Sequence, residues 1–130
     1  MILDTSFIID VMKKEPNAIE KLNSLVKKGE PLMIASPTIF ELFSGLVRSQ
    51  RQLEEKNKVM NVINGQLVLP LDNKSAERSG EIDGTLVKEG KMIDPIDSMI
   101  AGIAIIKNDK VLTRNVKDFS RIKDLKIETY

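Results

Sequence analysis

Four acidic side chains stand at points of the sequence where a strand should end or a helix should begin. Asp4 follows the first apolar run, and Asp118 follows the last long one. Glu41 falls in the first turns of an expected helix, and Asp97 lies near the start of another. Carboxylates are the ligands that hard cations such as Mg²⁺ and Mn²⁺ prefer, so the chemistry these residues offer is that of a divalent metal site.

The residue types that the chain lacks exclude most other catalytic chemistry. Its 130 residues include no histidine, no cysteine and no tryptophan. A Ser-His-Asp or Cys-His nucleophile needs a histidine base, and a structural zinc site needs cysteine or histidine ligands. The P-loop, the dinucleotide-binding glycine motif and the G-x-S-x-G nucleophile elbow are absent as well. Any catalysis is therefore expected to use carboxylates.

Length and composition predict a single domain over residues 1–130. Hydrophobic residues make up 42% of the chain, and 20 basic against 19 acidic residues give a net charge of +1. This balance argues against a globally basic nucleic-acid-binding protein but allows a local basic rim. The lack of cysteine fits a cytoplasmic protein, and no apolar stretch approaches the roughly 20 residues of a membrane span, so no membrane association is expected.

Short apolar runs alternate with amphipathic stretches along the chain. We expect strands over 1–3, 32–35, 67–69, 111–113 and 125–129, and helices over 6–12, 17–28, 37–47, 53–63, 73–89 and 95–106. Such an alternation predicts a three-layer α/β/α sandwich with a mostly parallel sheet of four to five strands.

Two features of the expected helix after the second strand bear on Glu41. Ser36 is expected to be its N-cap, with proline at the first helical position. Apolar residues recur there at helical spacing and are expected to form its buried face, namely Ile39, Phe43, Leu46 and Val47. This face would place Glu41 roughly opposite the core.

Parallel topology brings these candidates together. Helix N-termini lie along the same edge of such a sheet as strand C-termini, so Asp4, Glu41, Asp97, Asn115 and Asp118 should face one edge, where open α/β sheets bind ligands. Carboxylates gathered there would repel one another and raise their own pKa values. A divalent cation would remove this repulsion, and the partial positive charge of helix N-termini would ease the burial of the anions.

Each acidic residue also has a simpler explanation. Asp4 could accept hydrogen bonds from backbone amides after its strand, and Glu41 could be an ordinary solvated glutamate. Asp97 could only complement the helix dipole, and Asp118 could be a turn residue. Asp94 is best explained as an N-cap. The nearby hydroxyls are more often helix caps than members of a site, and they are Thr5, Ser6 and Thr113.

Four short stretches in a fixed order carry a family resemblance. They are Met1–Ser6, Ser36–Leu42, Ile93–Ala104 and Val111–Phe119. In this order and spacing they resemble PIN-domain proteins, in particular VapC-type toxin ribonucleases of type II toxin-antitoxin systems. The resemblance implies the three-layer fold, dependence on Mg²⁺ or Mn²⁺, and endonucleolytic cleavage of RNA. It also implies a homodimer and a cognate antitoxin protein.

The resemblance gives each acidic residue an expected role in metal-assisted phosphodiester hydrolysis. Asp4 and Asp97 would hold the principal cation, which activates the attacking water. Glu41 would bind the metal or orient that water. Family members place the fourth acidic group either at the position of Asn115 or at that of Asp118, so this sequence leaves open which residue supports the first ion or a second one.

Basic residues near the expected edge are candidates for RNA contacts through phosphates, and most of them could equally be solvated charges. They are Lys13, Lys14, Arg48, Arg114 and Lys117. The helices between Asn17 and Ile63 are candidates for a dimer face. Two other functions stay open: an RNA-processing or DNA nuclease that is not a toxin, and a catalytically inactive binding module.

Overall fold

Five parallel strands form one sheet at the centre of the molecule, in the order β3-β2-β1-β4-β5. The computed structural model describes all 130 residues. The strands are β1 (Ile2–Leu3), β2 (Met33–Ala35), β3 (Leu67–Leu69), β4 (Lys110–Leu112) and β5 (Lys126–Glu128). Every neighbouring pair is parallel, and β5 is an edge strand, as the sequence predicts.

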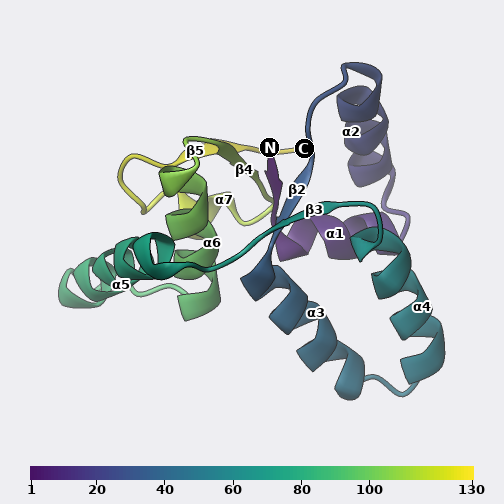
Figure 1. The fold of residues 1–130 in the computed structure, drawn as a ribbon, viewed down its shortest axis with the longest axis horizontal. Coiled ribbons are helices and arrows are strands. Elements are labelled where there is room, and N and C mark those ends of the chain that lie inside the picture. Colours follow the sequence, from purple (N-terminus) through teal and green to yellow (C-terminus); the bar gives the residue numbers. More distant parts are fainter.

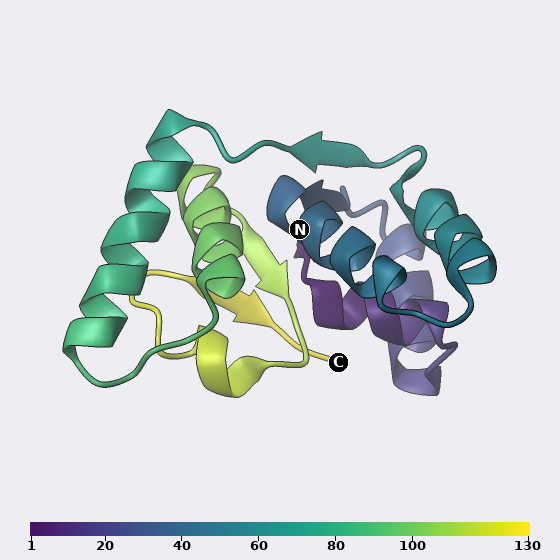
Figure 2. The same ribbon diagram turned by 90° about the horizontal axis from the view of Figure 1, so that it is seen from below.

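Seven helices cover the sheet and complete the predicted three-layer fold. They are α1 (Thr5–Met12), α2 (Pro16–Lys27), α3 (Ser36–Val47), α4 (Gln52–Ile63), α5 (Asn73–Lys88), α6 (Pro95–Ile106) and α7 (Val116–Phe119). Figures 1 and 2 show α5 and α6 on one side of the sheet and α1 to α4 on the other. No helix is long and apolar enough to cross a membrane.

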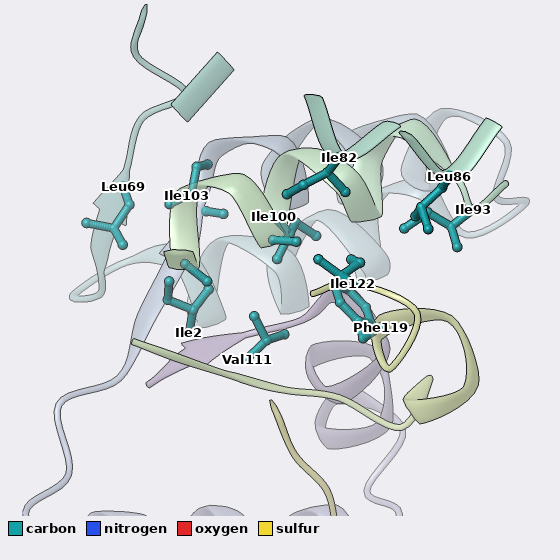
Figure 3. Packing of buried hydrophobic residues seen from close by; sticks show 13 residues of the cluster. Ile2, Leu69, Ile82, Leu86, Ile93, Ile100, Ile103, Val111, Phe119 and Ile122 are labelled. Atoms are coloured by element: carbon teal, nitrogen blue, oxygen red, sulfur yellow. The ribbon is translucent and has the colours of Figure 1, made fainter. Parts of the chain in front are cut away.

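Alternation along the strands divides the core into two clusters. Successive side chains of a strand point to opposite faces of a sheet, so adjacent residues of β1 enter different layers. Ile2 belongs to the cluster beneath α5 and α6, whereas Leu3 packs with residues of α1, α2, α3 and α4. Figure 3 shows the first cluster, in which Ile100 and Ile103 of α6 lie between the sheet and Ile82 of α5.

Helix α6 is buried because it packs closely against both the sheet and α5. Gly102 faces α5 at a point where a Cβ atom would lie 2.8 Å from the backbone oxygen of Ser75 and 2.9 Å from the backbone nitrogen of Ser79. Only a residue without a side chain allows this approach. The small residues of α6 thus set the distance between the two helices.

The start of α3 differs from the expectation. Ser36 is the first helical residue, and Ala35 occupies the N-cap position without a side-chain bond. The Ser36 hydroxyl instead accepts a hydrogen bond of 3.1 Å from the backbone N–H of Leu71. The expected cap at Ser36 is therefore wrong by one residue, because the strand continues directly into the helix.

The buried face of α3 agrees in part with the expected one. Leu46 is buried and Ile39 and Phe43 pack against the core, as predicted, but Val47 is 71% exposed. The buried face also includes Thr38 and Leu42. Glu41 is half-buried rather than opposite the core.

Candidate active site

The site lies at the edge of the sheet where β1 and β4 end and where α3 and α6 begin (Figure 1). Asp4 follows β1 directly, and Asp97 belongs to the first turn of α6. Asn115 and Asp118 come from the segment after β4, which forms the short helix α7. The sequence did not predict α7, since four residues are too few to show a helical period.

Asp4 is held by hydroxyl groups. It is only 3% exposed, and its Oδ2 accepts hydrogen bonds of 2.7 Å from both Ser6 and Thr113. Although Asp4 occupies the N-cap position of α1, its side chain accepts no backbone N–H. The simpler explanation of Asp4 as an acceptor for backbone amides is therefore wrong. Its Oδ1 has no hydrogen-bond partner in the protein and is free for another ligand.

Glu41 reaches the same area from α3. The Thr5 hydroxyl donates a 2.7 Å hydrogen bond to its Oε1 and lies 3.4 Å from the hydroxyl of the buried Thr38. Burial raises the pKa of Glu41, and the charges of Asp4 and Asp94 raise it further, against the opposing effect of the bond from Thr5. Glu41 is thus not an ordinary solvated glutamate.

Asn115 joins the two remaining carboxylates. Its Nδ2 donates to Oδ2 of Asp97 at 3.3 Å and to Oδ2 of Asp118 at 3.0 Å. Both residues that could supply the fourth group of the site therefore lie in it, with the neutral amide between two acids. The backbone of Asn115 is held as well, because its N–H donates to the hydroxyl of Thr113 at 2.9 Å.

Asp94 is the N-cap of α6, as predicted, and its Oδ1 accepts a 2.8 Å bond from the backbone N–H of Ile96. Its charge nevertheless acts on the site, because it raises the pKa values of both Glu41 and Asp97. Asp94 is thus a structural residue that adds negative potential to its neighbours.

Three of the four acidic groups of the site have no basic partner within the protein. Asp4, Glu41 and Asp97 form no ion pair within 4.0 Å, and Asp118 has only Arg121 at 3.9 Å. Burial raises the pKa of Asp97 to about 7, and repulsion by Asp4, Glu41, Asp94 and Asp118 contributes to this shift. Repulsion of this kind requires that the carboxylates lie close together.

The donor set fits a hard divalent cation. It consists of carboxylate and amide oxygens with free lone pairs and offers no nitrogen or sulfur ligand for a softer metal. The structure has no group of three or more acidic side chains close enough together to hold a metal ion as it stands. Mg²⁺ commonly binds proteins through only one or two carboxylates, together with waters and substrate phosphates.

The basic candidates are spread around the site. Lys13 and Glu41 line the same cavity of about 240 Å³, which α1, α3 and α4 enclose with both apolar and charged side chains. Lys14 follows α1, and Lys117 is exposed on α7. Arg48 lies past the far end of α3 from the site, and its Nε donates to the backbone oxygen of Ser44. Arg114 pairs with Asp10 at 2.7 Å.

Comparison with known proteins agrees with this geometry. A model of the PIN domain matches residues 1–125. The chain belongs to the PIN-domain family. It is 32% identical to the tRNA(fMet)-specific endonuclease VapC of Shigella flexneri, over 98% of this chain and 96% of the relative. The family resemblance inferred from the four motif stretches is therefore confirmed.

Solved structures of VapC-type PIN domains show the same fold. The VapBC2 complex of Rickettsia felis, bound to a DNA fragment from its promoter, superposes with a TM-score of 0.89 at 26% identity and covers 99% of this chain and 97% of that one. The DNA-bound VapBC of Salmonella typhimurium gives 0.88 at 30% identity, over 98% and 96% of the two chains. The PIN fold predicted from the sequence is thus confirmed along nearly the whole chain.

Sequence reasoning missed two residues beside the site. Asp10 is only 4% exposed on α1, and Tyr130 lies at the other end of the chain, yet the Tyr130 hydroxyl donates a 2.6 Å hydrogen bond to Asp10. No local pattern pairs residues so far apart. The one available signal was the acidic residue within the apolar stretch 7–12, which is unusual on a buried helix.

Proposed function

We propose that this chain is a divalent-metal-dependent endoribonuclease and the toxin of a VapBC-type toxin-antitoxin pair. The observation that carries the proposal is the group of neighbouring carboxylates that has no cation of its own, in a chain of the VapC type. The reaction is hydrolysis of an RNA phosphodiester bond by water. A single nuclease domain over residues 1–130, acting in the cytoplasm, is part of this proposal.

In this proposal, some side chains of the site bind the cation and another orients the attacking water. Mg²⁺ or Mn²⁺ bound there supplies a Lewis acid for the phosphate oxygens and lowers the pKa of water. Asp4 and Asp97 would be the main ligands of the cation, with Asp118 beside them. The Asn115 amide links Asp118 to Asp97 by donating a hydrogen bond to each. Glu41 orients the attacking water.

Three hydroxyl groups support the carboxylates from outside. Thr5 fixes Glu41, while Ser6 and Thr113 fix Asp4 through the same oxygen, which leaves Oδ1 of Asp4 directed to another partner. Hydroxyl donors orient an acid without neutralising it, unlike lysine or arginine. Such outer partners typically contribute about 10–100-fold to metal affinity or activity.

RNA is held by basic side chains on the rim of the site through its phosphates. We infer this role for Lys13, which lines the cavity beside Glu41, and for Arg114 and Lys117 in the segment after β4. Lys14 lies past the end of α1 and lines a separate hollow with Pro16 and Glu20, so it is a weaker candidate. Arg48 is the weakest of the candidates, because it lies two helical turns beyond Glu41.

The antitoxin and a second copy of the chain are the proposed protein partners. The relatives solved as VapBC complexes support the antitoxin. The cavity between α1, α3 and α4 reaches Glu41, so a partner segment seated there would lie against the acidic site and block it. Exposed apolar side chains on α3, Phe40 and Val47, fall within the helices proposed for the dimer face.

The experiment that tests the function is incubation of the purified protein with total cellular RNA, with Mn²⁺ or with EDTA, followed by mapping of the cut ends. We expect discrete cuts with Mn²⁺ and none with EDTA. Asp4→Asn should lower the cleavage rate by more than the ~100-fold upper range of outer-shell changes. Because the change removes a repelling charge, the melting temperature in EDTA should be no lower than that of wild type. Asp124→Asn, on an exposed aspartate outside the site, serves as the matched control.

Other outcomes identify the alternatives. Full activity of Asp4→Asn with an unchanged melting temperature would refute the assignment of the site. Cleavage of DNA in preference to RNA, or trimming of a single RNA precursor, would point to a nuclease that is not a toxin. Absence of both cleavage and Mn²⁺-dependent stabilisation would indicate a binding module.

A further inference from the structure

A buried carboxylate outside the acidic cluster has its own set of partners. Asp10 is 4% exposed on α1, and its two oxygens accept bonds of 2.7 and 2.9 Å from one terminal nitrogen of Arg114. Oδ2 also accepts the 2.6 Å bond from the hydroxyl of Tyr130. A buried charge is tolerated only when it is paired and hydrogen-bonded, and Asp10 meets both conditions.

Arg114 uses only part of its donor capacity in this network. Its side chain is 63% exposed, and Nη1 alone bonds within the protein, so Nε and Nη2 carry free N–H groups into solvent. The planar fork of a guanidinium matches two oxygens of a phosphate. Arg114 therefore presents a free, oriented donor face while one edge is anchored.

The anchored arginine is connected to the acidic site through its backbone. The N–H of Arg114 donates to the Ser6 hydroxyl at 3.2 Å, and that hydroxyl donates to Asp4 at 2.7 Å. The next residue, Asn115, bonds Asp97 and Asp118. The guanidinium thus stands on the segment that also holds the proposed metal ligands.

Tyr130 fixes the orientation of Asp10. Its ring packs edge-on against Phe7 with 4.9 Å between the centroids, and its hydroxyl points to the carboxylate. Burial and the hydrogen bond to Asp10 raise the pKa of Tyr130, so the hydroxyl stays a donor at any physiological pH. Oδ2 of Asp10 thereby accepts hydrogen bonds from both Tyr130 and Arg114.

We propose that Asp10 and Tyr130 are positioning residues that hold Arg114 ready to bind a phosphate of the RNA strand beside the one that is cleaved. This inference rests on the proposed function and adds a substrate contact to the same site. Preorganisation is the physical advantage, because a free arginine would lose side-chain entropy on binding RNA and an anchored one has lost it already.

The test separates binding from chemistry. A short fluorescein-labelled single-stranded RNA is titrated with the protein in EDTA, where the proposed cleavage is off, at several salt concentrations. We expect Arg114→Ala to weaken binding by about 10-fold and to reduce the slope of log affinity against log salt by roughly one phosphate contact. Arg114→Lys should keep most of the salt slope but lose part of the affinity.

Positioning is tested by a double-mutant cycle. Tyr130→Phe keeps the ring on Phe7 and removes only the hydroxyl, and we expect it to weaken RNA binding about 3-fold, within the range of one hydrogen bond. In the Arg114→Ala background the same change should have no further effect. In steady-state cleavage with Mn²⁺, both changes should raise KM and leave kcat within about 2-fold.

A matched control variant tests whether Tyr130 acts only by stabilising the C-terminal segment. Glu128→Gln breaks the 2.8 Å ion pair with Lys21 and so loosens the same C-terminal segment without touching Arg114. It should leave RNA affinity unchanged. Equal loss in Glu128→Gln and Tyr130→Phe, or a Tyr130→Phe effect that persists without Arg114, would overturn the positioning role.

The two proposals fail in distinguishable ways. Binding that depends on Arg114 without any Mn²⁺-dependent cleavage would refute the nuclease and keep the phosphate contact. Cleavage with RNA affinity and KM unaffected by Arg114→Ala would refute the contact and keep the nuclease. No measurable affinity for RNA would refute both.

Discussion

Neutral donors, rather than cations, organise the acidic residues of the site. Thr5, Ser6 and Thr113 donate to Glu41 and Asp4, and the amide of Asn115 donates to Asp97. These bonds restrict the carboxylates without cancelling their charge. The protein therefore keeps a strong local attraction for a cation at the expense of its own stability in the absence of one.

This repulsion predicts a pH dependence for the metal-free protein. Folding raises the pKa of Asp97 from 3.8 to about 7, so the folded state holds a proton that the unfolded chain has released. Because the folded state binds more protons in this window, its stability falls as pH rises from about 4 to about 7. Asp97→Asn should remove this part of the decline, and Glu41 contributes in the same direction.

Urea unfolding in EDTA across this pH range, with wild type and Asp97→Asn side by side, measures the effect. The variant should gain stability over wild type toward pH 8 and lose that advantage near pH 4. A difference between the two proteins that stays constant with pH would contradict the burial and repulsion described for Asp97.

The acidic residues could be predicted from sequence because each sits at a strand or helix end that the apolar pattern reveals. The pairing of Asp10 with Arg114 and Tyr130 could not, because it joins three segments with no periodic relation. The supporting hydroxyls were named, but not the bonds that they make, since a threonine at a helix start has capping as its commonest role.

Among the elements, α6 positions Asp97. It carries Asp97 in its first turn, is capped by Asp94, and lies buried between the sheet and α5. A rigid, buried helix fixes the attachment point of Asp97 more closely than a loop would. The cap and the packing of α6 can each be tested by paired substitutions.

Two changes at Asp94 separate its cap from its charge. Asparagine caps helices as well as aspartate does, so Asp94→Asn should keep the bond to Ile96 while removing a charge that repels Asp97 and Glu41. In EDTA at pH 8 we expect Asp94→Asn to be at least as stable as wild type. Asp94→Ala should lose about 1 kcal/mol.

Thermal unfolding of both variants checks this expectation. If Asp94→Asn and Asp94→Ala lose the same stability, the carboxylate acts neither as a simple cap nor as a source of repulsion. The comparison needs no assay of activity.

Two glycines give opposite predictions for the packing of α5 and α6. Gly102→Ala would press a methyl group against the backbone of α5, and we expect a loss of about 1–3 kcal/mol. Gly80 lies on the open side of α5, where a methyl group would have no atom of another residue within 4 Å. Gly80→Ala should therefore gain about 0.5–1 kcal/mol through helix propensity.

Chemical denaturation of the two alanine variants decides between them. A stable Gly102→Ala protein would show that the helices can move apart, contrary to the close contact between Gly102 and Ser79. A loss of stability in Gly80→Ala would mean that this side of α5 is covered in solution.

The residue ranges of the helices could largely be predicted from the sequence, but the side that a helix turns toward the core could not. The expected ranges of α5 and α6 agree with the structure to within one residue, and Asp94 bonds as the expected N-cap of α6. The expected apolar face of α3 was wrong at Val47, which is exposed, and it missed the buried Thr38 and the half-buried Glu41. Hydrophobic spacing does not show such a face when polar groups of the site belong to it.

At the scale of the whole molecule, binding of a metal to the folded state would add to the free energy of unfolding. The proposed ligands come from the end of β1, from α3, from α6 and from the segment after β4, so only the folded chain brings them together. A cation that binds the folded state alone stabilises it by RT ln(1 + [L]/Kd), which is about 2.7 kcal/mol at 100 times Kd. Mn²⁺ should therefore raise the melting temperature of the entire domain in one transition.

Thermal melts with increasing Mn²⁺ measure this linkage. Asp4→Asn and Asp97→Asn should each lose most of the shift, while Asp124→Asn should retain it. An equal shift in all four proteins would place the cation elsewhere on the molecule.

The central position of β1 has a consequence for synthesis of the chain. The first strand to leave the ribosome is completed on one side by β2 but on the other only by β4, and the backbone N–H of Asp4 bonds the oxygen of Leu112 at 3.0 Å. Such distant pairing delays assembly until late in elongation. The acidic site is therefore completed only after Asn115 and Asp118 have been added, close to the end of translation.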